Sequence, residues 1–121
     1  MTDYLIAERS FDFAVKIVEL YKRLRCDKKE YILSKQLLRA GTSIGANVAE
    51  AQRGQSKADF ISKMNIALKE ANETDYWLRL LNRTGYIADT DFKELKNEIE
   101  GIISILTAIG RTASANMKNK K

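Results

Sequence analysis

The sequence contains no histidine, no proline and a single cysteine. Without histidine the chain lacks the commonest general base and the commonest metal ligand, so we expect a protein that is not an enzyme and needs no metal or cofactor. Without proline, and with only six glycines, little interrupts a helix, so long helices are predicted. Cys26 has no partner for an internal disulfide, which favours a cytoplasmic location.

Long apolar runs are also missing. No stretch of about 18 apolar residues is present, so we expect no membrane span. The N-terminus lacks a basic segment followed by an apolar one, which argues against a signal peptide. The length of 121 residues, with 45% hydrophobic and 31% charged residues, is typical of one globular domain. We expect that domain to span residues 1–121, with a basic flexible tail from about 116 to 121.

Apolar residues recur at helical spacing in four segments. The first predicted helix runs from about Phe11 to Leu24, with Ser10 as a candidate N-cap. The residues before Ser10 either extend this helix or lie along the bundle. The second runs from about Lys28 to Arg53, and its Gly41–Gly45 stretch is poor in helix formers, which predicts a bend or a tightening of the helix there. A capping signal, Ser56 with Asp59, starts the third helix, which ends before Gly85. Asp89 or Thr90 caps the fourth.

The apolar stripes of the last three helices match one another. In an antiparallel hairpin, the sequence numbers of facing residues have a nearly constant sum. The second and third helices satisfy this rule with the pairs Ala51–Phe60, Val48–Met64, Ile44–Ala67, Gly41–Ala71 and Leu37–Thr74. The third and fourth satisfy it with Leu81–Leu95, Leu78–Ile99, Thr74–Ile102, Ala71–Leu106, Ala67–Ile109 and Met64–Ala113. The stripes therefore predict an all-α, antiparallel up-down four-helix bundle.

The net charge of +5 is unevenly distributed. Eight basic and three acidic residues lie between Lys16 and Arg39, whereas acidic residues predominate from Lys57 to Glu100. Such a basic segment is typical of a surface that meets nucleic-acid phosphates, although a solvated surface with a frayed basic tail is an equally good interpretation. The candidate contacts are Lys22, Arg23, Arg25, Lys28, Lys29 and Lys35, with help from the tail lysines Lys118, Lys120 and Lys121.

Several polar residues fall near the predicted helix contacts. The hairpin register places Arg39 opposite Glu70 or Glu73, which predicts an interhelical ion pair that fixes the register. Asn47 and Glu50 either bond to neighbouring helices or face water. The carboxylates lack the other ligands of a metal site in a bundle, so we expect none.

The third and fourth helices carry more apolar residues than one bundle face requires. The additional side chains are Ile61, Leu68, Trp77, Leu80, Ile103 and Ile105. Helices that are apolar on more than one face must be covered on each of them, which predicts self-association. The alternative cover is the N-terminal segment around Leu5 and Ile6. The pair Tyr76–Trp77 could stack on bases, but a core or interface position is the favoured interpretation.

The run from Lys35 to Ala51 resembles the signature of bacterial four-helix bundle proteins encoded in intervening sequences of 23S ribosomal RNA genes. The resemblance continues from Asp59 to Leu81, although Gly45 stands where many members have proline, so a softer kink is implied. The resemblance implies a four-helix protomer that assembles into a ring-like homopentamer. A distant relative, the accessory protein of diversity-generating retroelements, forms a basic pentameric barrel linked to nucleic-acid and reverse-transcriptase binding.

Two hypotheses follow. The first is a homo-oligomeric, pentameric scaffold that binds RNA or DNA through phosphate contacts, with avidity multiplied by the number of subunits. The second is a scaffold for a protein partner, held in an apolar groove or on a ring face without direct nucleic-acid contact.

Overall fold

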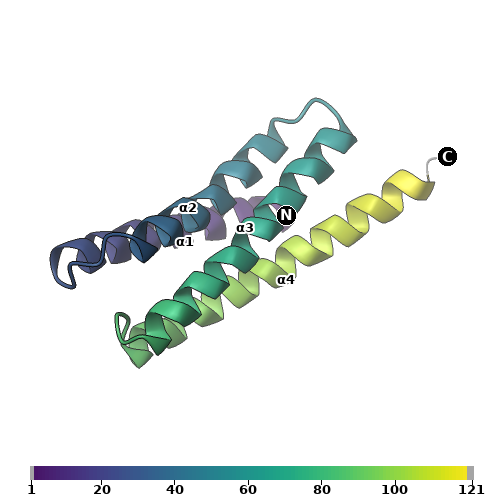
Figure 1. The fold of residues 1–121 in the computed structure, drawn as a ribbon. Helices are drawn as coiled ribbons and strands as arrows, with labels where there is room; N and C mark the ends of the chain where they lie inside the picture. The colour runs from purple at the N-terminus through teal and green to yellow at the C-terminus, as the bar shows by residue number, and fades with distance from the viewer. Residues whose placement is uncertain (1, 120–121) are drawn as a thin grey trace.

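A computed structural model describes the backbone of residues 2–119 and the side chains of residues 4–116. Over that range the chain forms four helices and no strand: α1 (Thr2–Cys26), α2 (Leu33–Gln52), α3 (Lys57–Arg83) and α4 (Asp89–Asn119). Consecutive helices pack against each other, and α1 also packs against α4. The α1–α2 and α3–α4 connections lie at one end, and the α2–α3 connection and the end of α4 lie at the other (Figure 1). The predicted all-α four-helix bundle is confirmed.

The core consists of the predicted apolar stripes. All the inward positions predicted on α3 from Met64 to Leu81 are buried, and so are those on α2 from Leu37 to Ala51 and on α4 from Leu95 to Ile109. The outermost members Leu33, Phe60 and Phe92 are half-buried. The periodic positions therefore face a single core, to which α1 adds Ile6, Phe13, Ile17, Leu20 and Leu24.

Ser10 is not the N-cap of the first helix, because the residues before it extend the helix, which was one of the two alternatives for that segment. α1 begins at Thr2, so Ser10 lies inside the helix, where its hydroxyl donates to the carbonyl of Ala7 at 3.3 Å. Ser10 is fully buried, and so is Ile6 one turn earlier. The inward face of α1 thus extends to the N-terminal side of Ser10. Ser10 can occupy a buried position on that face because its hydroxyl hydrogen-bonds within its own helix.

The second helix, in contrast to the first, begins later than predicted. α2 starts at Leu33, and residues 28–32 belong to the α1–α2 connection. The Glu30 carboxylate accepts hydrogen bonds from the N–H groups of Ile32, Leu33 and Ser34, at 3.1, 3.1 and 2.7 Å. A carboxylate that satisfies these first amides takes the place of a preceding helical turn.

The other helix ends follow the predicted signals closely. Ser56 Oγ accepts from the N–H of Asp59 at 3.1 Å, which confirms the cap of α3. α3 ends at Arg83, before Gly85, whose φ of 88° suits a residue without a Cβ atom. The predicted cap of α4 at Asp89 or Thr90 is slightly late, since the Phe92 N–H already bonds to the Ala88 carbonyl at 2.9 Å. α4 continues to Asn119, so the predicted tail starts as helix, whereas Lys120 and Lys121 and the side chain of Lys118 lie outside the described residues.

The apolar residues left exposed are not the predicted ones. Leu68, Trp77, Ile103 and Ile105 pack against the core, and Ile61 and Leu80 are half-buried. In the N-terminal segment, which was the alternative cover, Ile6 joins the core and Leu5 is 48% exposed. The largest exposed group lies instead on α1, at Tyr4, Leu5, Phe11 and Val15. None of the helices, over the described range, is long and apolar enough to cross a membrane.

Glycine allows α1 and α2 to approach closely. α2 is continuous through Gly41 and Gly45. A Cβ atom on Gly41 would lie 2.9 Å from both Cγ atoms of Ile17, and one on Gly45 would lie 3.3 Å from the Ser10 carbonyl oxygen. Ile17 is fully buried and its β-branched side chain has little freedom to move aside. The two glycines are therefore needed for contact between helices rather than for a turn.

We expect Gly41→Ala to lower the free energy of unfolding by about 1 kcal/mol, since overpacking against Ile17 outweighs the gain in helix propensity. The matched control is Gly110→Ala in α4, where the nearest atom to the new Cβ is Asn65 Oδ1 at 3.6 Å. That control should be neutral or raise stability by up to about 1 kcal/mol. Urea unfolding followed by circular dichroism at equal protein concentration measures both, and equal stabilisation by the two changes would contradict the close-packing argument.

Candidate nucleic-acid interface

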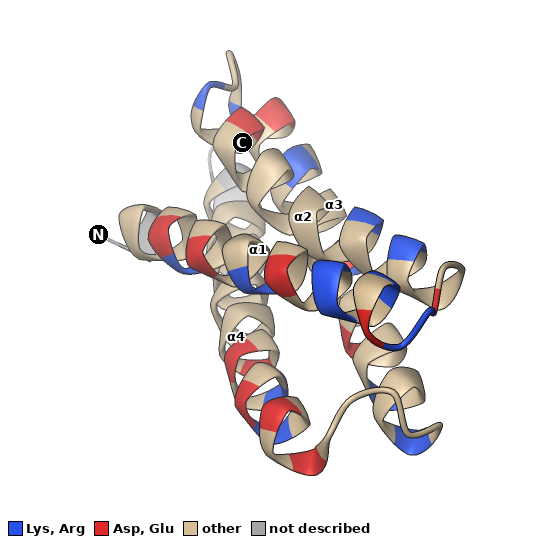
Figure 2. Ribbon diagram, turned by 90° about the vertical axis from the view of Figure 1, so that its left-hand side faces the viewer, with Lys and Arg blue, Asp and Glu red and all other residues tan. Residues whose placement is uncertain are grey.

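The fold brings the six predicted phosphate-binding residues to one end of the bundle. Lys22, Arg23 and Arg25 lie in the last turns of α1, Lys28 and Lys29 in the connection, and Lys35 in the first turn of α2. All six are exposed. Figure 2 shows Lys and Arg gathered at the C-terminal end of α1 and along the connection, whereas Asp and Glu gather on the N-terminal part of α4. We call these six residues the basic end.

Arg23 is less available than the other members of the basic end. Its Nη1 atom lies 3.5 Å from Asp91 Oδ2 on α4. Two turns earlier on the same face of α1, Lys16 Nζ lies 3.0 Å from Glu94 and 2.8 Å from Glu98, and hydrogen bonds to Glu98 and then Glu94 raise the pKa of Lys16. Arg23 thus continues a row of ion pairs between α1 and α4.

Four lysines of the basic end have no such compensation. Among the described residues, no carboxylate forms an ion pair with any of them: Lys22, Lys28, Lys29 and Lys35. An unpaired exposed lysine can contact a phosphate without first breaking an internal ion pair. These four are therefore the strongest candidates.

Arg25 is held by two tyrosines. Its guanidinium carbon lies 5.7 Å from the ring centroids of both Tyr21 and Tyr31, within the range of cation–π contacts. Its Nη1 atom also donates to the Tyr21 hydroxyl at 3.3 Å. The spacing of Tyr21 and Arg25, one helical turn, could have indicated the first contact, but Tyr31 lies in the connection, where periodicity gives no information.

The connection itself is anchored by Glu30. Burial raises the pKa of the Glu30 carboxyl, but the hydrogen bonds from Ser34, Leu33 and Ile32 lower it more, so its net pKa is below the ordinary value. The Ser34 hydroxyl donates to the Glu30 carbonyl at 2.8 Å, and Lys29 adopts the left-handed conformation with φ of 56°. The basic end is consequently built on a defined turn.

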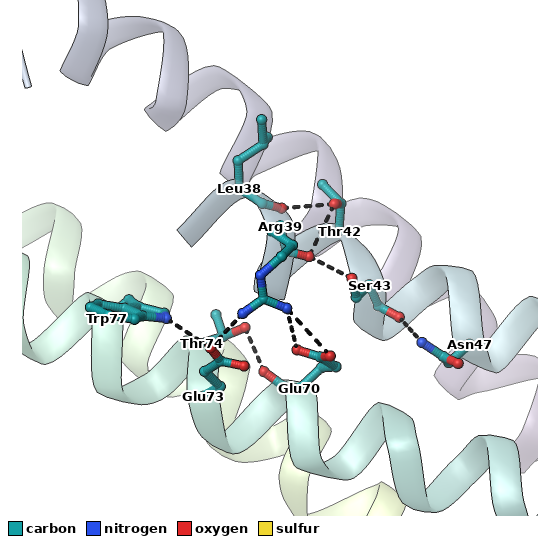
Figure 3. A network of polar contacts seen from close by, with 9 residues as sticks. All are labelled: Leu38, Arg39, Thr42, Ser43, Asn47, Glu70, Glu73, Thr74 and Trp77. Atoms are coloured by element: carbon teal, nitrogen blue, oxygen red, sulfur yellow. Dashed lines mark hydrogen bonds and ion pairs between the residues drawn. The ribbon is translucent and has the colours of Figure 1, made fainter. Parts of the chain in front are cut away.

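The predicted ion pair of Arg39 is present between α2 and α3 (Figure 3). Arg39 Nη1 lies 3.2 Å from Glu70 Oε1, and its Nη2 atom bonds to Glu73, which also accepts from Trp77 Nε1 at 3.3 Å. The bond from Arg39 holds the pKa of Glu73 below its ordinary value, and together these contacts raise the pKa of Arg39. The guanidinium is about half exposed, so the pair joins two helices at their surface.

The other two residues of the predicted polar network do not join Arg39. Asn47 donates to the Ser43 carbonyl within α2 at 2.8 Å (Figure 3), and Glu50 pairs with Lys63 at 3.2 Å. In the described part of the chain, no three acidic or cysteine side chains are placed to hold a metal ion. Arg39 and Glu50 thus form separate ion pairs between α2 and α3, and Asn47 bonds within α2.

Two surface hollows lie away from these polar contacts. A groove of about 780 Å³ lies at the end opposite the basic end, and its walls include Ala51, Phe60, Ile61, Ile109 and Ala113. A hollow of about 270 Å³ adjoins the basic end between α1 and the α3–α4 connection, and Arg23, Asp27, Lys28 and Asp91 line part of it. Neither contains Arg39, Asn47, Glu50, Glu70 or Glu73.

The side chains of Tyr76 and Trp77, which could stack on bases, differ in exposure although their rings are in contact. Their rings meet edge to face, with centroids 5.0 Å apart. Trp77 packs on the core, as the favoured interpretation held, whereas Tyr76 is 50% exposed. Trp77 is therefore not available for stacking.

Comparison with known proteins identifies a family and a similar solved structure. The family model of the 23S rRNA-intervening sequence protein matches residues 2–108. A crystal structure of a protein of unknown function, from the S23 ribosomal protein family of Bacteroides thetaiotaomicron, is similar with a TM-score of 0.90 and 52% sequence identity. The match covers 92% of this chain and 99% of that one. Comparison with curated proteins gives no match.

We expect Arg39→Met to lower the free energy of unfolding by about 1 kcal/mol at pH 7, because the change leaves two adjacent carboxylates without their cation. The pKa of Glu73 is lowered in the folded state, so its contribution is present above the ordinary value of 4.5 and is lost as the pH falls through the folded value. The loss of unfolding free energy caused by Arg39→Met should therefore be smaller at a pH of about 3 than at pH 7.

The matched control is Lys63→Met, since Lys63 pairs with a Glu50 carboxylate that is 61% exposed. It should cost less than about 0.5 kcal/mol. Thermal unfolding of both variants at the two pH values gives the comparison. An Arg39→Met penalty that is independent of pH would show that packing, and not the ion pair, is responsible.

Proposed function

The chain belongs to the 23S rRNA-intervening sequence protein family, and we propose that it is a non-enzymatic, homo-oligomeric scaffold that binds RNA or DNA through its basic end. The observation that carries the proposal is the group of uncompensated lysines, Lys22, Lys28, Lys29 and Lys35, on one end of a rigid bundle. When such lysines contact phosphates, they displace counterions that are condensed on the nucleic acid. The release of these ions supplies most of the affinity of non-specific binding.

An exposed apolar face on α1 supports self-association. Tyr4, Phe11 and Val15 are 67%, 68% and 46% exposed, and their spacing of seven and four residues places them on one face of the helix. Covering these side chains with a second copy would remove apolar surface from water. The number of five subunits comes from the family resemblance.

Self-association would increase the effect of the basic end. One protomer offers four uncompensated lysines, whose combined contribution is modest at physiological salt. In an assembly, once one subunit has bound a nucleic acid, the next subunits bind it at a high effective concentration. An oligomer could thus retain a nucleic acid that a single subunit releases.

The groove at the opposite end favours a second candidate function. Its walls include apolar residues of α2, α3 and α4 beside the polar α2–α3 connection, so it could hold an apolar segment of a partner protein without nucleic-acid contact. This scaffold would copurify with a protein after nuclease treatment.

We expect the protein to bind generic single-stranded RNA with an affinity that falls as salt rises. Replacing Lys28, Lys29 and Lys35 together by alanine should reduce the slope of log K against log salt by about 2 in magnitude, because each single-strand phosphate contact contributes about 0.7. Filter binding across a salt series measures the slope.

The charge-matched control replaces Lys57, Lys69 and Lys93, three exposed lysines on α3 and α4 that form no ion pair among the described residues. Its slope should stay close to that of the unmodified protein. Affinity that is negligible at low salt, or that falls equally in both triple variants, would contradict a localised phosphate site.

We expect Phe11→Glu to dissociate the assembly, because a carboxylate cannot be buried in an apolar contact without a partner. Light scattering should give a mass near five times the protomer mass of 13.8 kDa for the unmodified protein and 13.8 kDa for the variant. Tyr76→Glu, at a 50% exposed position on α3, should leave the mass unchanged. A monomeric unmodified protein at micromolar concentration would rule out the assembly.

A further inference from the structure

We infer that the basic end recognises single strands, with a base stacked on Tyr31 and the adjacent phosphates held by Lys28, Lys29 and Lys35. This inference rests on the proposed function and narrows it to one class of nucleic acid. Its basis is an exposed aromatic ring inside a short connection that also carries uncompensated lysines.

Tyr31 and Ile32 are neighbouring large apolar side chains that are both exposed. Tyr31 is 47% exposed and Ile32 is 75% exposed, the largest fraction among the exposed large apolar side chains. Arg25 lies over the Tyr31 ring, and this contact restrains the ring without covering it. A restrained ring with accessible surface can stack on a base, and the adjacent isoleucine adds apolar contact area.

The local backbone keeps this ring in place. Tyr31 follows Glu30, whose carboxylate binds the N–H groups of Ile32, Leu33 and Ser34. It also lies two residues after Lys29, which occupies the left-handed region. The backbone is therefore fixed both before and after Tyr31. Stacking of a base on this ring would cost little conformational entropy of the protein.

The surrounding charges favour a phosphate chain along the connection and the start of α2. Lys28 and Lys29 precede Tyr31, and Lys35 follows it at the beginning of α2. The acidic side chains Asp27 and Asp91 line the neighbouring hollow beside α4, where Arg23 compensates Asp91. The charges in this hollow largely cancel, because Arg23 and Lys28 also line it, whereas Lys29 and Lys35 lie beside Tyr31 in the sequence without an ion-pair partner among the described residues.

Base pairing would remove the stacking contribution. In a duplex, the bases are stacked on their neighbours and their faces cannot reach a protein ring, so only the phosphates remain available. An unpaired strand offers both the phosphates and the base faces. The geometry therefore predicts a preference for single strands that depends on Tyr31, in addition to affinity that depends on the lysines.

The test is fluorescence anisotropy with a labelled oligouridine of about 12 nucleotides and an RNA duplex of about the same length. Tyr31→Ala should weaken binding of the single strand by about tenfold and change duplex binding by less than about twofold. Tyr31→Phe should retain single-strand affinity, since the ring is kept. Tyr76→Ala removes an equally exposed tyrosine from α3 and should change neither affinity.

The outcomes separate this inference from the proposed function. Lysine-dependent binding of both probes with no effect of Tyr31→Ala would overturn the inference and leave the proposed function standing. Binding of neither probe by the unmodified protein would overturn both. A change of oligomeric mass in Tyr31→Ala, measured by light scattering, would assign the exposed ring to a subunit contact and also overturn the inference.

Discussion

The burial of one apolar stripe on α3 is the constraint on which the other features depend. That stripe meets α2 on one side and α4 on the other, and small residues at Ala67 and Ala71 let larger neighbours interdigitate. A register slip on either side would bury polar residues and expose apolar ones. The same register brings Arg39 to Glu70 and Glu73, so the surface ion pair follows from core packing.

The basic residues of α1 and of the α1–α2 connection have two different roles. One face of the helix carries Lys16 and Arg23, which pair with acidic residues of α4 and hold the first and last helices together. The C-terminal end and the connection carry lysines without such partners. The overall charge of +5 is therefore a poor guide to binding, because part of the basic segment is already neutralised by the fold.

Opposite ends of the bundle suit different partners. One end combines uncompensated lysines with Tyr31 on an anchored turn, and the other contains the apolar groove beside the α2–α3 connection. The exposed face of α1 lies on a third surface, where Tyr4, Phe11 and Val15 share one side of the helix. Self-association through α1 would therefore use side chains distinct from those of the basic end and the groove.

Helical periodicity was sufficient for the core, the antiparallel pairing and the ion pair of Arg39, since residues that recur every turn must share one face and a short connection sets the register. Periodicity failed at Ser10, at residues 28–32 and at the exposed apolar residues. In each case a contact that apolar spacing does not show decided the outcome: the close approach of Ser10 to Gly45, the local hydrogen bonds of the Glu30 carboxylate, and the packing of Leu68 and Ile103 against the core. The available lysines and the position of Tyr31 likewise emerged only from the tertiary structure, because residue type does not show which charge meets a partner across the bundle.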